Sequence, residues 1–210
     1  MLSRIRKRVK TLNVPVVTLM AINDWDSFKI LIATVLSLRT KDEVTGAASR
    51  RLFSLANDVY TMSRLSEKTI EKTIYPVGFF RQKAKFIKEI CAILIDRFNG
   101  KVPKRMEDLL SLPGVGRKTA NLVLAKGFGK YAICVDTHVH RICNRWGYVY
   151  TKNPDETEAI LRQKLPKRHW ISINDLLVAY GQGICVPVSP FCSKCVVKEF
   201  CPKVGVKKSR

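Results

Sequence analysis

The sequence lacks a long apolar run and a secretion signal. Its longest apolar stretch, ILIATVL at 30–36, has the length of a core helix segment and is far shorter than the roughly 20 residues that span a bilayer. The basic start of the chain is interrupted by Pro15 and followed by acidic residues, without a small-residue cleavage site. We therefore expect a cytosolic chain that retains its N-terminus and has no membrane partner.

Acidic residues are scarce relative to basic ones. The 210 residues include 17 Asp and Glu against 38 Lys and Arg, which gives a formal net charge of +21. A field of this sign attracts polyanions. Nucleic acid is the first candidate, because neutralised phosphates release counterions and give affinity without base contacts. A membrane surface is the alternative.

The sequence also lacks strand-like alternation, repeats and low-complexity linkers, while helical spacing occurs nearly everywhere. Residues 28–36 and 86–98 each carry an apolar face, and the second should end at Asn99 and Gly100. Thr40 with Glu43 has the form of a capping box, and Asn153 offers a helix cap with proline following it. These patterns predict an all-α fold.

The seven cysteines fall into two groups. Three lie in apolar stretches and are interpreted as small core residues: Cys91, Cys134 and Cys143. The other four have the spacing C-x6-C-x2-C-x5-C in a Pro-rich and Cys-rich loop that packing alone cannot hold, and they are Cys185, Cys192, Cys195 and Cys201.

Four thiolates on such a loop satisfy either tetrahedral zinc or an iron–sulfur cluster, whose binding would fold the loop. The single C-x2-C pair favours a cubane cluster, and two disulfides or four unrelated thiols are the disfavoured alternatives. Lys194 and Lys198 project from the same loop. They are either contacts to phosphate or solvated surface lysines.

The segment LPGVGRKTA at 112–120 joins two amphipathic helical patterns. Pro113 fixes φ, and Gly114 and Gly116 can adopt conformations closed to other residues, so the segment predicts a helical hairpin. Its bend would expose backbone N–H groups at the start of the second helix, where a phosphate oxygen binds well. A plain helix connector is the alternative interpretation.

Two polar residues after this turn suggest chemistry. Lys118 lies in the first turn of the second helix, where the helix dipole disfavours a cation and so would favour the nucleophilic neutral amine. Asp136 follows the apolar residues 131–135 and begins another helix pattern. It is predicted to cap that helix and to hold a carboxylate near Lys118. A solvated lysine is the ordinary alternative.

The chain resembles the endonuclease III family of helix-hairpin-helix DNA glycosylases in three features together: the segment LPGVGRKTANLVL, the segment VDTHVHRICNR and the cysteine spacing. The resemblance extends to 36–45 and 77–87 and covers almost the whole chain. It implies two helical domains flanking a DNA-binding cleft. One is a six-helix barrel at 21–131 with a helix-hairpin-helix motif near 106–127, and the other joins 1–20 to 132–210 around a [4Fe-4S] cluster.

The resemblance also implies a function. Lys118 would be the nucleophile and Asp136 the essential carboxylate of a bifunctional DNA glycosylase and AP lyase that removes oxidised pyrimidines. Monofunctional relatives carry serine or tyrosine at the position of Lys118. The partner would be double-stranded DNA with damaged bases or abasic sites, bound by a monomer in the cytoplasm at the nucleoid, or in the nucleus of a eukaryote. The hairpin would contact this DNA through Gly114, Val115, Gly116 and Arg117.

Two residues depart from the family pattern. Arg39 stands where glutamine is frequent, and Phe79 stands where a leucine wedge is common. We expect Arg39 to fill the space left by the flipped base or to alter the preference for the opposing base, and we expect the Phe79 ring to stack on an exposed base. The alternatives are a surface arginine and a partly buried core phenylalanine. His138 and His140 flank the helix of Asp136 and either orient DNA or pack.

The sequence is compatible with two other functions. A monofunctional glycosylase would release a base without cutting the strand. A non-catalytic DNA-binding or redox-sensing module would use only the hairpin and the metal loop, and it would bind DNA without turnover.

Overall fold

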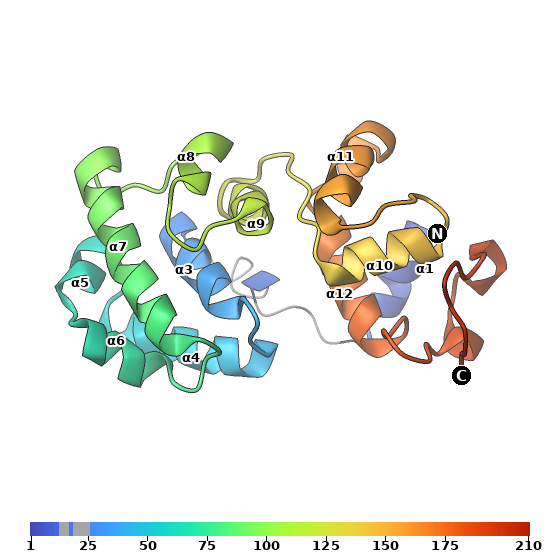
Figure 1. Cartoon of the computed structure of the whole chain (residues 1–210), viewed down its shortest axis with the longest axis horizontal. Coiled ribbons are helices and arrows are strands. Elements are labelled where there is room, and N and C mark those ends of the chain that lie inside the picture. Colours follow the sequence, from blue (N-terminus) through green and yellow to red (C-terminus); the bar gives the residue numbers. More distant parts are fainter. Residues whose placement is uncertain (13–16, 19–25) are drawn as a thin grey trace. The chain divides into compact units, whose positions relative to one another are not determined.

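The computed structural model describes residues 1–12, 17–18 and 26–210, and these form helices joined by turns, without strands (Figure 1). The all-α prediction is confirmed. The chain divides into two compact units, one of Val16–Lys130 and the other of Met1–Pro15 with Tyr131–Arg210. The predicted domain boundary after residue 20 lies outside the described residues. None of the described helices is long and apolar enough to cross a lipid bilayer.

The unit Val16–Lys130 is built around α3 (Ser27–Ser37), which is buried nearly all round and packs against α4, α7 and α9. A helix that is apolar on every side is stable only when other helices cover it. Along the chain, α3 is followed in this unit by α4 (Asp42–Leu55), α5 (Val59–Arg64), α6 (Glu67–Ile74), α7 (Phe80–Phe98), α8 (Met106–Leu110) and α9 (Arg117–Phe128). Of these, α5 and α6 pack against α7, and α8 packs against α9.

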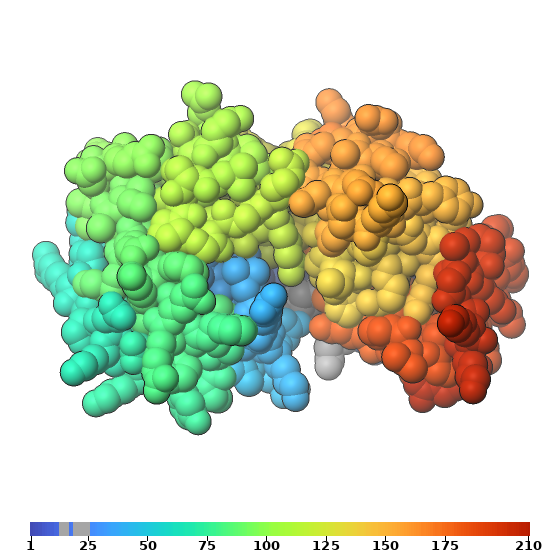
Figure 2. All heavy atoms as spheres, in the orientation of Figure 1, coloured from blue at the N-terminus to red at the C-terminus, as the bar shows by residue number. Residues whose placement is uncertain are grey.

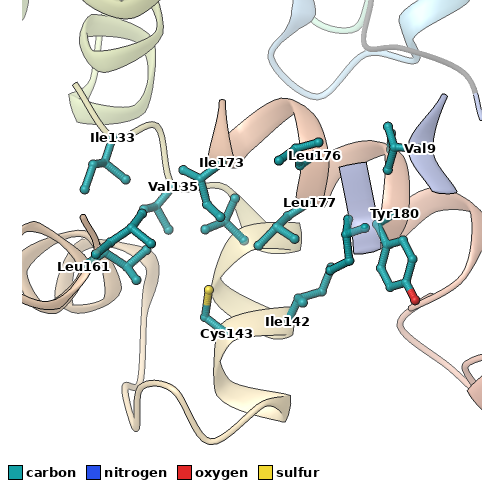
Figure 3. Close-up of a cluster of buried hydrophobic side chains, with 14 of the residues drawn as sticks. Val9, Ile133, Val135, Ile142, Cys143, Leu161, Ile173, Leu176, Leu177 and Tyr180 are labelled. Atoms are coloured by element: carbon teal, nitrogen blue, oxygen red, sulfur yellow. The ribbon is translucent and has the colours of Figure 1, made fainter. Parts of the chain in front are cut away.

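The other unit packs α12 (Ile173–Gly183) against α10 (Thr137–Arg145) and against α1 (Leu2–Val9). Val9, Ile142, Leu177 and Tyr180 belong to its buried core (Figure 3). The remaining elements are α11 (Pro154–Lys164) and three short 3₁₀ turns, η1 (Lys167–His169), η2 (Cys192–Lys194) and η3 (Lys198–Phe200). The segment after α12, red in Figure 2, lies beside the region of α10.

Most of the local predictions agree with the structure. α7 ends at Asn99 and Gly100, which have φ values of 51° and 74°. Asn153 caps α11 by accepting a hydrogen bond from the Glu156 N–H at 2.9 Å. The three cysteines predicted for the core, Cys91, Cys134 and Cys143, are buried.

The predicted capping box of Thr40 and Glu43 is wrong. α4 begins after Lys41, and no side chain caps it. The Thr40 hydroxyl instead donates to the Leu38 carbonyl and accepts from the Gly78 N–H at 3.2 Å. A tertiary contact with a distant turn therefore replaces the local cap.

Candidate active site

The predicted hairpin is present, with α8 and α9 joined by the turn at 111–116. The Val115 N–H donates to the Leu112 carbonyl at 3.1 Å and closes the turn. Gly114 has φ of 72°, and a Cβ there would lie 2.6 Å from the Phe86 ring. Only glycine meets both demands. A Cβ on Gly116 would meet nothing within 4 Å, so this residue leaves an open surface at the start of α9.

Lys118 and Arg117 are exposed in the first turn of α9. The N-cap of this helix is Gly116, which has no side chain to accept from the first backbone N–H groups. The positive end of the helix dipole is consequently not neutralised by a capping side chain. Such an end attracts an anion such as a DNA phosphate.

Asp136 is buried, with 9% of its surface exposed, and it is the N-cap of α10 as the sequence predicts. Its Oδ1 accepts from the His138 N–H and the Val139 N–H, both at 2.9 Å. One carboxylate oxygen therefore carries both capping hydrogen bonds. Lys118 belongs to the unit Val16–Lys130 and Asp136 to the other unit.

His138 packs against α12, because a Cβ on Gly181 would lie 2.5 Å from its Nδ1. Its Nδ1 also lies 3.1 Å from the Arg141 guanidinium, which donates further to the carbonyls of Gly181 and Cys185. Arg141 thus connects the helix of Asp136 to the first cysteine of the loop. His140 on the same helix forms a hydrogen bond with the Thr157 hydroxyl at 2.7 Å, as expected of a packing residue.

Arg39 and Phe79 come together within the unit Val16–Lys130. The Arg39 guanidinium lies 5.6 Å from the centroid of the Phe79 ring, within the range of a cation–π contact. Phe79 is 59% exposed, so the alternative of a partly buried core phenylalanine is wrong. A stacked cation and an exposed ring are suited to contact nucleotide bases.

The four loop cysteines are free thiols that line one cavity, together with Arg145 and Tyr180. The Arg145 guanidinium donates to Cys185 Sγ at 3.3 Å, and the Tyr180 hydroxyl donates to Cys195 Sγ at 3.1 Å. Burial and the three neighbouring thiols raise the pKa of Cys201. Hydrogen-bond donors aimed at sulfur suit thiolate ligands. Four sulfur donors around one cavity therefore fit a bound metal cluster.

Within residues 1–12, 17–18 and 26–210, no three His, Cys, Asp or Glu side chains meet the geometry for a single metal ion. The two loop lysines are both exposed, Lys194 on η2 and Lys198 on η3. Lys194 lies 5.7 Å from the Phe191 ring centroid.

Two buried cations were not predicted from the sequence. Arg145 is 9% exposed and donates to the carbonyls of Val186 and Pro187, which holds the start of the cysteine loop. Lys83 is 4% exposed on α7. The sequence does indicate that Lys83 is buried, because it precedes Ile87 by one helical turn and therefore shares the apolar face of that helix.

The comparisons with known proteins agree on one family. Residues 32–167 match the model of the HhH-GPD superfamily base excision DNA repair proteins. Endonuclease III of Thermotoga maritima is 47% identical over 85% of this chain and 84% of its own length.

Two solved structures cover 96% of this chain and 92% of theirs, each with 33% identity and a TM-score of 0.86. They are a non-covalent complex of endonuclease III with DNA and a trapped covalent endonuclease III–DNA intermediate. The chain therefore belongs to the HhH-GPD superfamily and, within it, to the endonuclease III family of DNA glycosylases with AP lyase activity.

Proposed function

We propose that this protein removes oxidised pyrimidines from double-stranded DNA through a Schiff base on Lys118 and then cuts the strand by β-elimination. The observation that carries the proposal is the likeness to endonuclease III structures, one of which is a trapped covalent intermediate on DNA. This chain has a lysine, Lys118, in the first turn of the hairpin's second helix, exposed to solvent.

The chemistry follows from a neutral amine on Lys118. Nζ attacks C1′ of the damaged nucleotide, the glycosidic bond breaks, and the base leaves with the bonding electrons and takes up a proton. Opening of the sugar ring gives an imine between Nζ and C1′. Loss of the C2′ proton then expels the 3′ phosphate, and hydrolysis of the imine regenerates the lysine.

Asp136 supplies the negative charge in this proposal. Because its Oδ1 carries both capping hydrogen bonds, its orientation on α10 is fixed. The carboxylate would stabilise positive charge that develops on the sugar and would accept a proton during attack. Both side chains must therefore reach the same deoxyribose during the reaction.

DNA binding is supported by charge and by the hairpin. The net charge of +21 favours the phosphate backbone at low salt. The turn from Gly114 to Arg117 would give backbone N–H groups to one phosphate. Lys194 and Lys198 would add contacts from the cysteine loop, and His138 would contact DNA beside Asp136.

The cysteine loop would hold a [4Fe-4S] cluster through Cys185, Cys192, Cys195 and Cys201. When bound, the cluster supplies four covalent attachments that fix an irregular loop. Arg145 and Tyr180 would donate hydrogen bonds to two of its thiolates. Brown protein with stoichiometric iron and sulfide would support this proposal, and colourless protein carrying zinc would contradict it.

Borohydride trapping tests the lysine chemistry. Reduction of the imine would give a stable covalent complex with duplexes that contain an abasic site or an oxidised pyrimidine. Lys118→Ala should abolish this complex. Lys126→Ala changes another lysine of α9, in its last turn, and should leave the trap intact. An undiminished trap in Lys118→Ala would require a different amine.

A panel of duplexes, each with one defined lesion, tests the substrate. Base release and strand scission are scored separately for every duplex. Oxidised pyrimidines should give both products. Base release without scission until alkali is added would instead indicate a monofunctional glycosylase, and tight binding without turnover would indicate a binding module.

A further inference from the structure

Two turns of the unit Val16–Lys130 meet in an unusual conformation. Arg39 in the turn between α3 and α4 has φ of 52°, and Phe79 at the start of α7 has φ of 57°. Left-handed backbone is uncommon for residues other than glycine and persists only where surrounding contacts impose it. A Cβ on Gly78 would lie 2.6 Å from the Arg39 carbonyl, so the two turns are in direct backbone contact.

Lys83 supplies the contacts that hold these turns. From α7, its Nζ donates to the carbonyl of Leu36 at 2.8 Å and to that of Leu38, both at the end of α3. The same Nζ lies 3.1 Å from the Thr40 hydroxyl. Carbonyls at a helix C-terminus carry negative partial charge and are good acceptors for an ammonium group.

Thr40 extends this network to the second turn, because its hydroxyl also accepts from the Gly78 N–H. Leu38 and Thr40, on either side of Arg39, are thus both hydrogen-bonded to Lys83. Gly78, which precedes Phe79, is hydrogen-bonded to Thr40. Among the described residues, Lys83 has three polar partners, all uncharged, although its side chain is almost fully buried. Burial lowers the pKa of Lys83 to about 8. A cation buried without an ion pair destabilises a fold, which suggests a role other than stability.

We propose that Lys83 is a positioning residue that locks the two turns together and thereby sets how Arg39 and Phe79 meet the base opposite the lesion. The assignment of Arg39 and Phe79 to DNA rests on the proposed function. Lys83 itself would not touch DNA. Its loss would leave both side chains present but free to adopt several orientations, and discrimination among opposing bases would fall.

Lys83→Met tests the proposal, since methionine keeps much of the apolar length and removes the ammonium group. Lys88→Met is a matched control. Lys88 also lies on α7, and its Nζ donates to the carbonyls of Ser63 and Leu65, at the end of α5. The control removes the same kind of contact from a helix end that carries neither Arg39 nor Phe79.

The first readout is base release from a lesion placed opposite each of the four bases. We expect Lys83→Met to lower the rate on the preferred pair by about tenfold, because small misplacements of contact groups have large effects. The ratio of the base-release rates on preferred and disfavoured pairs should fall toward one. Lys88→Met should keep the wild-type ratio even if it lowers stability.

A double-mutant cycle shows whether Lys83 acts through Arg39. If it does, Lys83→Met should change opposing-base discrimination little in a protein that already carries Arg39→Ala. Additive effects of the two substitutions would overturn the proposal. A wild-type ratio in folded Lys83→Met would overturn it as well.

The second readout does not depend on the chemistry. A duplex carries a non-cleavable tetrahydrofuran abasic analogue opposite 2-aminopurine, whose fluorescence rises when the base is unstacked. The wild type should raise the fluorescence and Lys83→Met should not. If the wild type releases no base but this difference persists, the proposed chemistry fails and the role of Lys83 stands. Equal fluorescence with both proteins would overturn the role of Lys83.

Thr40→Val keeps the proposal testable if Lys83→Met does not fold. Valine has nearly the shape of threonine but lacks the hydroxyl that joins the two turns. It should reduce discrimination in the same direction by a smaller factor. Folded Thr40→Val with wild-type discrimination and wild-type fluorescence would count against the proposal.

Discussion

The N-termini of α9 and α10 share a backbone conformation and differ in chemistry. Both N-cap residues are extended, Gly116 with φ of −93° and Asp136 with φ of −112°. At α10 the N-cap carboxylate accepts from two backbone N–H groups, whereas the N-cap of α9 is a glycine, which has no side chain to accept from them. The difference shows that two helix ends with the same N-cap conformation can differ in whether the N-cap residue supplies a capping acceptor, and only the end without one suits the anionic ligand of the proposed function.

The charges near the two ends also differ. A carboxylate at the positive end of a helix dipole is favourable, and a cation there is unfavourable. Asp136 therefore stabilises α10, while Lys118 is placed against the dipole of α9. Stability alone would not select a lysine at this position. The proposed nucleophile thus occupies the position where chemistry, rather than folding, explains the residue.

Asp136→Asn should have the largest effect on activity, because it removes the proposed catalytic charge. The substitution also separates the catalytic role of this side chain from its role as a helix cap. Asparagine keeps an oxygen that can cap the helix but removes the charge. We expect base release to slow by about 10²-fold to 10⁴-fold, the usual contribution of an acid–base group. The unfolding free energy should fall by less than about 1 kcal/mol. Single-turnover kinetics and denaturant unfolding measure the two quantities.

The matched control is Asn153→Asp at the N-cap of α11, where the same exchange runs in reverse. It should leave base release unchanged, since no catalytic role is proposed for α11. A wild-type rate in Asp136→Asn would show that the carboxylate of Asp136 serves only as a cap.

Gly114→Ala should be the next largest change, since it affects the turn that opens the N-terminus of α9. Alanine at φ of 72° is strained, and its Cβ would collide with the Phe86 ring. We expect the unfolding free energy to fall by about 1–3 kcal/mol. Gly129→Ala is the control, because Gly129 has φ of 62° but an added Cβ there would meet no atom within 4 Å.

Urea unfolding of the two alanine variants would separate backbone strain from steric collision. Gly129→Ala should lose only the strain contribution, on the order of 1 kcal/mol. Equal losses in both variants would mean that the Phe86 ring moves aside without cost, and that the hairpin turn needs glycine only for its φ.

Sequence reasoning succeeded where the determining contacts are local. The cap of α11 by Asn153 depends on a residue three positions away, and the glycine turn depends on its own φ values. The all-α prediction rests on similar short-range periodicity. In each case the interaction that fixes the backbone is visible within one helical turn of sequence.

Prediction from the sequence failed where a distant segment supplies the hydrogen-bond partner. Thr40 matched a local capping pattern, yet its hydroxyl binds Gly78, which lies 38 positions away. Lys83 binds carbonyls 45 and 47 positions away, and a carbonyl acceptor has no sequence signature. Positioning contacts of this kind therefore require the folded structure, although the residues that they position can be found by motif.

Gly116→Ser should give the smallest effect and tests the comparison of the two helix ends most directly. A serine hydroxyl at this extended N-cap would supply the capping acceptor that Gly116 lacks and would accept from a backbone N–H group of the first turn of α9. We expect stability to rise by a few tenths of a kcal/mol. Affinity for an abasic-analogue duplex should fall by about threefold to tenfold, the equivalent of one hydrogen bond.

Gly116→Ala separates capping from bulk, because a Cβ at this position meets nothing within 4 Å. Alanine cannot cap, so this variant should lose a little stability, and it should bind DNA more tightly than Gly116→Ser. Equal loss of affinity in both variants would show that DNA approaches closely enough to exclude any Cβ. In that case DNA binding would require glycine at 116 because it leaves steric room for DNA. The absence of a capping side chain would not be the reason.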